Sequence, residues 1–151
     1  MSGPWLTDDQ QRTWRTYLRM QAEIQSRLNR QLQVDHGLSL ADYEVLVHLG
    51  AADGHRMRPF ELGAAMQWEQ SRLAHQLARM QRRGLVERRS CATDRRGAYV
   101  VLSEAGGQAL DKAAPGHVGA VRRLLFDGLT EGQVGELETI CKTVLANLPC
   151  T

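Results

Sequence analysis

Several features that mark membrane, secreted and metal-binding proteins are missing from this sequence. Its 151 residues contain no run of about 18 apolar residues, so no transmembrane helix is expected. The opening residues, MSGPWLTDDQQ, have neither the charged nor the apolar region of a secretory signal. We therefore expect a cytoplasmic protein that does not act at a membrane.

Cysteine is scarce as well, with only Cys91, Cys141 and Cys150 and no Cys-x-x-Cys pair. This number and spacing argue against a disulfide framework and against a structural zinc site. The five histidines form no i,i+4 pair, so no metal site is expected. A Gly-rich phosphate loop and a G-x-S-x-G motif are also missing. We therefore expect neither a cofactor nor enzymatic activity.

The formal net charge is only +2, but the positive charge is unevenly placed. Residues 69–97 contain eight arginines and three acidic residues, a net charge of +5, whereas residues 1–68 carry −1 and residues 98–151 carry −2. A local excess of this kind is the electrostatic footprint expected of a polyanion site. A solvated charged face is the other interpretation of the same pattern.

Apolar spacing and capping signals predict six helices and one β-hairpin. The expected helices are 7 to about 34, 39 to about 52, 58–66, about 69–83, 103–126 and 130 to about 148, and the expected strands are 85–91 and 98–102. Glycines at 106, 107 and 116 and proline at 115 predict a weak or bent fifth helix. The side chains expected to face the core are Tyr43, Leu46, Val47 and Leu49 in the second helix and Phe60, Leu62 and Met66 in the third.

This order of elements predicts a mainly α fold with a small β-hairpin, an α+β arrangement in one chain of residues 1–151. Residues 39–102 form a winged helix-turn-helix by pattern. The flanking helices, 7–36 and 103–148, carry apolar stripes that are larger than this middle region can cover. We therefore expect the flanking helices to face a partner as well as their own domain.

The fourth helix has one apolar edge and one cationic face. On a helical wheel Leu73, Leu77 and Met80 cluster at the buried edge. The first residues of the second helix in a helix-turn-helix reach base edges in the major groove, where arginine can bond guanine bidentately. The residues predicted to meet DNA bases here are Trp68, Gln70, Ser71, Arg72, His75 and Gln76, and Arg79, Arg82 and Arg83 are placed to meet phosphates.

The hairpin places two arginines at its tip, within the segment "RRGLVERRSCATDRRGAYVVLSEAG". Arg95 and Arg96 are predicted to enter the minor groove, whose width a cationic finger can sense. Asp94 would repel phosphates by itself, so we expect it to support the wing by holding one of these arginines in a charged hydrogen bond. A plain polar surface turn is the alternative.

Together, "RPFELGAAMQWEQSRLAHQLARMQRRGLVERR" and "DRRGAYVVLSEAG" resemble the MarR (multiple antibiotic resistance regulator) family of transcription factors. The resemblance covers about residues 10–148 and implies a recognition helix at 68–83 and a wing at 85–102. Asp94-Arg95-Arg96 matches the family's Asp-x-Arg wing motif. The chain departs from the common pattern at Trp68-Glu69, where a small polar cap is frequent.

The resemblance implies a bacterial homodimer that binds a pseudo-palindromic operator in double-stranded DNA. It also implies a repressor that a small, often aromatic or phenolic, ligand releases. Residues that could reach such a ligand are Trp14, Arg15, Arg19 and His117. A redox switch at Cys91 is a second possibility, because neighbouring cations can lower a thiol pKa. The family's redox sensors, however, use a cysteine in the early helices, and residues 1–90 contain none.

The same helices and strands also occur in a different class of protein. Winged helices also serve as protein–protein interaction modules, because a fold alone does not fix a function. An outward-facing Trp68 would be a good anchor for an acidic protein partner. The arginine-tipped wing favours DNA over this alternative.

Overall fold

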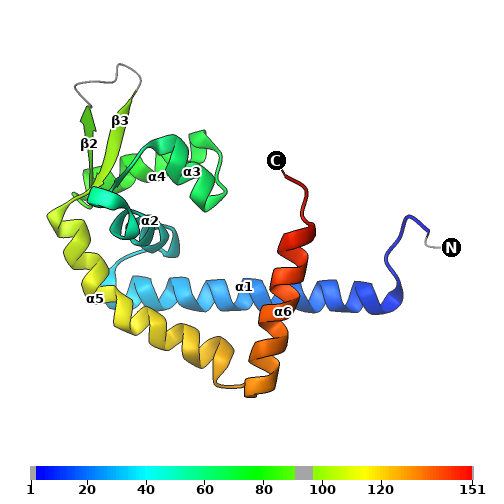
Figure 1. The fold of residues 1–151 in the computed structure, drawn as a ribbon. Coiled ribbons are helices and arrows are strands. Elements are labelled where there is room, and N and C mark those ends of the chain that lie inside the picture. The colour runs from blue at the N-terminus through cyan, green and yellow to red at the C-terminus, as the bar shows by residue number, and fades with distance from the viewer. Residues whose placement is uncertain (1–2, 91–96, 151) are drawn as a thin grey trace.

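A computed structural model describes residues 3–90 and 97–150, and within these ranges the chain forms six α-helices and a small antiparallel sheet. The helices are α1 (Asp8–His36), α2 (Leu40–Ala51), α3 (Pro59–Met66), α4 (Gln70–Arg82), α5 (Glu104–Val121) and α6 (Glu131–Asn147). The strands are β1 (Arg56–Met57), β2 (Val86–Ser90) and β3 (Ala98–Leu102). The mainly α fold with a winged helix-turn-helix is therefore confirmed. Figure 1 shows the wing strands at one side of the molecule, away from both termini.

The helices begin where the capping signals predicted. The side chains of Thr7, Ser39 and Thr130 each accept a hydrogen bond from the backbone N–H of the residue three positions later. The side chain of that later residue in turn accepts from the backbone N–H of the cap residue. Such capping boxes satisfy two backbone donors that a helix start leaves unpaired. Gly37 ends α1 in the left-handed conformation, with φ at 66°, which glycine adopts without steric cost. These local signals fix the helix ends independently of tertiary packing.

The sheet has the strand order β1-β3-β2, with both pairs antiparallel. In the wing pair, Val86 lies opposite Leu102 and Ser90 lies opposite Ala98. β1, which pairs with residues 100 and 101 of β3, was not predicted from the sequence. Two residues are too few to show the alternation that identifies a strand. β1 ties the segment before α3 to the base of the wing.

The core lies around α2, which contacts α1, α3, α4 and α5. The fully buried large side chains are Leu32, Leu38, Val45, Leu46, Leu49, Leu62, Leu73, Leu77, Met80, Val86 and Val100. Two inward predictions are wrong. Val47 is 40% exposed and Phe60 is 76% exposed, whereas Val45, which was not assigned to the core, is buried completely.

α5 runs as one helix from Glu104 through Pro115 to Val121 and continues into the π-helical turn η2 (Arg122–Phe126). Ser103 caps its first turn by accepting from the backbone N–H of Gly106 at 2.9 Å. Gly106 is buried because this turn packs directly against the backbone at Leu85. The predicted glycine-rich start is therefore a close contact rather than a weak point.

The two ends of the chain leave much apolar surface uncovered in one protomer. No residue of α6 is buried, and the exposed fractions of Ile140, Val144 and Leu145 are 60%, 55% and 67%. The first half of α1 is similar, with Trp14 52% exposed. In the described part of the chain, no helix combines the length and the apolar character needed to span a bilayer.

Candidate nucleic-acid interface

α4 presents the two faces that its sequence predicted. Leu73, Leu77 and Met80 are at most 1% exposed and join the core. The outward side carries the exposed residues Gln70, Ser71, Arg72, His75, Arg79 and Arg82. Glu69 occupies the N-cap position but makes no capping hydrogen bond with its side chain, as its side chain type suggested. The outward face therefore displays cationic and neutral hydrogen-bonding groups with no acid at its centre.

Trp68 supports this face rather than standing out from it. The indole is half-buried and packs against the core cluster. The guanidinium carbon of Arg72 lies 3.7 Å from the centre of the Trp68 ring. A stacked guanidinium keeps its N–H groups in the plane parallel to the ring, where they remain available to donate. The predicted outward tryptophan is thus a platform that orients the predicted base-reading arginine.

Gln76 is buried, and not exposed on the outward face of α4 as the sequence predicted. Its residue is 2% exposed, and its side chain donates to Asp42 and accepts from Arg79. A side chain this deeply buried, with its amide bonded to Asp42 and Arg79, does not reach a base edge in the groove. The base-reading role predicted for Gln76 is therefore not supported by its position.

The wing tip, Asp94, Arg95 and Arg96, and the nearby Cys91 lie outside the described residues. Tyr99, the second residue of β3 after the hairpin turn, has two guanidinium groups close to its ring. The carbons of these groups, in Arg56 and Arg58, lie 4.6 Å and 4.7 Å from the ring centre. These arginines come from β1 and from the N-cap of α3. Two arginines from outside the wing therefore lie beside β3, which was not predicted from the sequence.

The residues predicted to hold a ligand do not meet within one protomer. Trp14, Arg15 and Arg19 lie on the exposed first half of α1, where Trp14 stacks with Tyr17 at 5.9 Å between ring centres. His117 lies on α5, next to a glycine that approaches Gln31 of α1. Arg19 and Gln31 are separated by about 18 Å along the helix axis. Any site that joins these residues would need a second chain.

His117 occupies a partly buried place between α5 and α2. Its ring centre lies 4.2 Å from that of Tyr43. Burial lowers the pKa of His117 and raises the pKa of the Tyr43 hydroxyl, so both side chains are held neutral near pH 7. Two buried atoms, His117 Nδ1 and Gln31 Oε1, find no hydrogen-bond partner among the described residues. Unsatisfied polar atoms in the interior are costly unless something else bonds to them.

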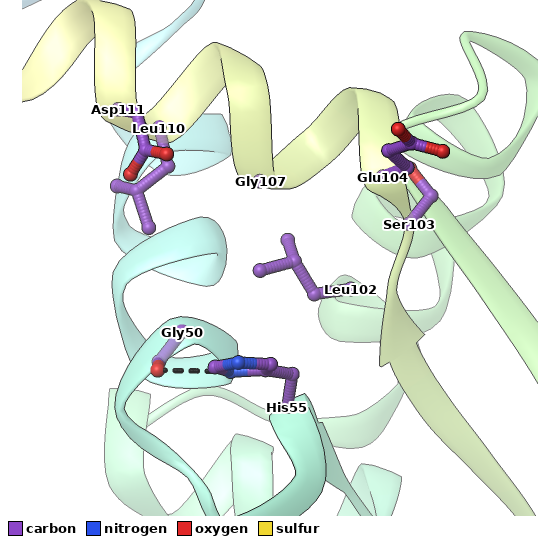
Figure 2. A pocket seen from close by; sticks show the side chains of 8 residues that line it. All are labelled: Gly50, His55, Leu102, Ser103, Glu104, Gly107, Leu110 and Asp111. Atoms are coloured by element: carbon purple, nitrogen blue, oxygen red, sulfur yellow. Dashed lines mark hydrogen bonds between the residues drawn. The ribbon is translucent and has the colours of Figure 1, made fainter.

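A cavity of about 330 Å³ lies between the end of α2, the loop before β1 and the start of α5. Figure 2 shows Leu102 directed into this space between Gly50 and Gly107. The His55 ring is held at its edge by a 3.1 Å contact with the Gly50 carbonyl oxygen. None of the four predicted ligand residues lines this cavity.

The core arrangement of α2, α3 and α4 with the hairpin β2–β3 defines a winged helix-turn-helix protein. Comparison with known proteins identifies its family. The family model described as "MarR family" matches residues 36–97. AbsC, a MarR family transcriptional regulator from Streptomyces coelicolor, is 40% identical, with 95% of this chain and 97% of that chain covered and a TM-score of 0.88. The chain belongs to the MarR family.

Two further relatives are similar over most of their length. Sco3205, a MarR family transcriptional regulator from Streptomyces coelicolor solved in complex with DNA, is 37% identical, covers 99% of this chain and 94% of its own, and has a TM-score of 0.92. The transcriptional repressor MprA of Escherichia coli (strain K12) is 25% identical over 134 residues, which are 89% of this chain and 75% of MprA.

Proposed function

We propose that the protein is a dimeric, sequence-specific DNA-binding regulator of transcription, acting mainly as a repressor, and not an enzyme. The observation that carries this proposal is the exposed cationic face of α4, with Arg72 stacked on Trp68 at its start. Support comes from Sco3205, which was solved with DNA, and from MprA, which is a transcriptional repressor. A bacterial regulator of this kind acts on the chromosome, in the cytoplasm.

The proposed DNA contacts fall into two groups. Gln70, Ser71, Arg72 and His75 meet base edges in the major groove because they occupy the exposed side of the first turns of α4. Arg79 meets the DNA further along the helix, and the predicted wing residues Arg95 and Arg96, supported by Asp94, enter the minor groove. Trp68 contributes by holding Arg72. Gln76 is left out of this set because it is buried.

The exposed apolar surface indicates which parts of the chain bind DNA and which form the dimer. Residues 39–102 bind DNA, and residues 7–36 and 103–148 form a homodimer through the exposed side chains of α1 and α6. A two-fold axis would then place the two copies of α4 about 34 Å apart, one turn of B-DNA. The operator is accordingly expected to be a pseudo-palindrome with half-sites one turn apart.

Binding to duplex DNA should depend steeply on salt. If each subunit neutralises about four phosphates, the slope of log K against log salt concentration is expected to be about −7 for the dimer. The measurement is fluorescence anisotropy on a duplex selected from a random pool, repeated over a range of sodium chloride concentrations. A slope near −1 would contradict contacts made by both the groove helix and the wing.

A charge on the apolar stripe of α6 should separate the subunits. Ile140→Glu places a carboxylate on a side chain that is 60% exposed in one protomer and that a dimer would bury, where an unpaired charge is costly. Light scattering should then give the mass of one 16.9 kDa chain instead of two. Thr139→Glu, on the opposite side of α6, is the control and should leave the mass unchanged. A wild-type protein that is already monomeric would refute the proposed dimer.

A ligand that gates DNA binding is the second part of the proposal. The unpartnered atoms of His117 and Gln31 lie where the long helix α1 meets α5 and the winged region. A small aromatic ligand whose hydroxyl group donates to Gln31 Oε1 would bias how the two parts pack. Trp14, Arg15 and Arg19 would take part only from the partner subunit.

The protein–protein interaction module remains the alternative function, but its main support is reduced. An exposed tryptophan was the feature that suggested a protein anchor, and Trp68 is half-buried beneath Arg72. The two functions differ in one result. An interaction module would not bind duplex DNA at moderate salt, whereas a repressor would.

A further inference from the structure

A buried carboxylate joins α4 to the junction of α1 and α2. The Asp42 side chain is 10% exposed, and its two oxygens accept from three groups. Oδ2 accepts from the backbone N–H of Ser39 at 2.9 Å and from Arg83 Nη1 at 3.0 Å, and Oδ1 accepts from Gln76 Nε2 at 2.5 Å. Arg83 also donates to the carbonyl oxygen of Gly37 at 2.7 Å. Asp42 therefore holds the capping box of α2 to Gln76 of α4 and to Arg83, the C-cap residue of α4.

Asp42 also determines which way the Gln76 amide points. An ionised carboxylate only accepts hydrogen bonds, so the amide must turn its Nε2 toward Asp42. The carbonyl oxygen Oε1 then faces away from Asp42, where it accepts from Arg79 Nη2 at 2.8 Å. Because an arginine has only donors, Arg79 can bond to the Gln76 oxygen but not to its amide nitrogen. The Gln76 amide therefore has one orientation that satisfies both Asp42 and Arg79. A charge in the interior thus fixes one end of a guanidinium on the exposed face of α4.

Fixing Arg79 in advance matters for binding. Long side chains lose rotamer freedom when they contact a partner, and pre-organisation reduces that loss. Arg79 lies two turns after Arg72 on the same exposed side of α4. Arg82 lies on the same exposed side of the helix and, within the described part of the chain, has no hydrogen bond like the one between Arg79 and Gln76, so it serves as the natural comparison.

We propose that Asp42 and Gln76 are positioning residues that hold Arg79 in the orientation in which it contacts DNA, without touching DNA themselves. This inference rests on the proposed DNA-binding function. It assigns a role to Asp42 and Gln76, the polar residues that are buried among those the structure describes. The geometry of the α1–α2 junction would then influence how Arg79 meets DNA, although the junction itself does not contact DNA.

A double-mutant cycle in DNA affinity tests the proposal. Gln76→Met keeps the shape of the side chain and removes both hydrogen bonds, and should weaken binding to the selected duplex about tenfold. In an Arg79→Ala background the same substitution should change the affinity by less than about twofold. Gln81→Met, at an exposed glutamine of the same helix, is the matched control and should have no effect. A loss of affinity that is equal in both backgrounds would overturn the proposal, because general damage to the fold acts in both.

A second measurement uses the wild-type protein without DNA, so that it does not depend on whether a variant folds. The nitrogen relaxation of the arginine side chains should give an order parameter above about 0.8 for the Arg79 Nε–H and below about 0.6 for that of Arg82. Equal mobility of the two arginines would overturn the proposal. Failure of the wild-type protein to bind any duplex would instead refute the proposed function, while the relaxation result would still be readable.

Discussion

Replacing Arg72 by alanine is expected to weaken binding of the dimer to its operator about a thousandfold. A bidentate arginine contact to guanine contributes about 2 kcal/mol, and two subunits each lose one, which gives about 4 kcal/mol in total. The expected loss is large because Arg72 lies in the first turn of α4, stacked 3.7 Å from the Trp68 ring centre and already oriented for the groove. Fluorescence anisotropy at one fixed salt concentration measures it.

Three companion variants separate the stacking from the charge. Arg72→Lys keeps the charge but lacks the planar fork, so it should restore little of the lost affinity. Trp68→Leu keeps apolar packing and removes the ring, with an expected loss of about tenfold from the freed guanidinium. Lys142→Ala, on α6 and away from α4 (Figure 1), also removes one positive charge and should leave the affinity unchanged. Wild-type affinity in Arg72→Ala would mean that this face of α4 does not meet the bases.

Replacing Gly106 by alanine is expected to lower the free energy of unfolding by about 3 kcal/mol. An added Cβ would lie 2.1 Å from the carbonyl oxygen of Leu85 and 2.9 Å from Cδ1 of Leu102. The leucine side chain can turn away, but the backbone oxygen cannot, because it accepts from the N–H of Ser103 at 3.2 Å. The start of α5 would have to move away from the wing. Urea unfolding followed by circular dichroism gives the change in free energy.

The neighbouring glycine provides the control. A Cβ at Gly107 would meet only Cδ2 of Leu102, at the ordinary distance of 3.9 Å. Alanine is the better helix former, so Gly107→Ala should raise the free energy of unfolding by about 0.5–1 kcal/mol. The two substitutions are chemically identical and adjacent, yet their effects should have opposite signs. Effects of the same sign would show that α5 does not approach Leu85 as closely as described.

Local signals in the sequence predicted most of the fold. The capping boxes at Thr7, Ser39 and Thr130 are complete within four residues each, so no tertiary knowledge was needed to place them. Phe60 was assigned wrongly although the pattern contained the answer. It lies about 200° around the helix from Leu62, so the two cannot face the same core. Val47 was a harder case, because α2 is apolar on several sides and packs against four helices.

The sequence predicted which face of α4 is exposed, but not the contacts that its residues make with other elements. The helical wheel identified the exposed cationic face of α4 because that face depends on one helix alone. The burial of Gln76 depends on Asp42, 34 positions earlier in the chain, and no pattern within α4 reports such a partner. The inward position of Trp68 has the same cause, since it follows from packing against other elements. Long-range partners of polar residues are what the sequence alone did not reveal.

The exposed apolar surfaces of α1 and α6 make the stability of this protein depend on its concentration. A helix without a covered face has only its own propensity to hold it, which is marginal in water, and α6 has no buried residue. If a second copy supplies that cover, mass action sets the melting temperature, which should rise as the sample is concentrated. In a cell, newly synthesised chains at low concentration would then be monomeric and most susceptible to proteolysis. The regulator would resist proteolysis only once its concentration is high enough for the dimer to form.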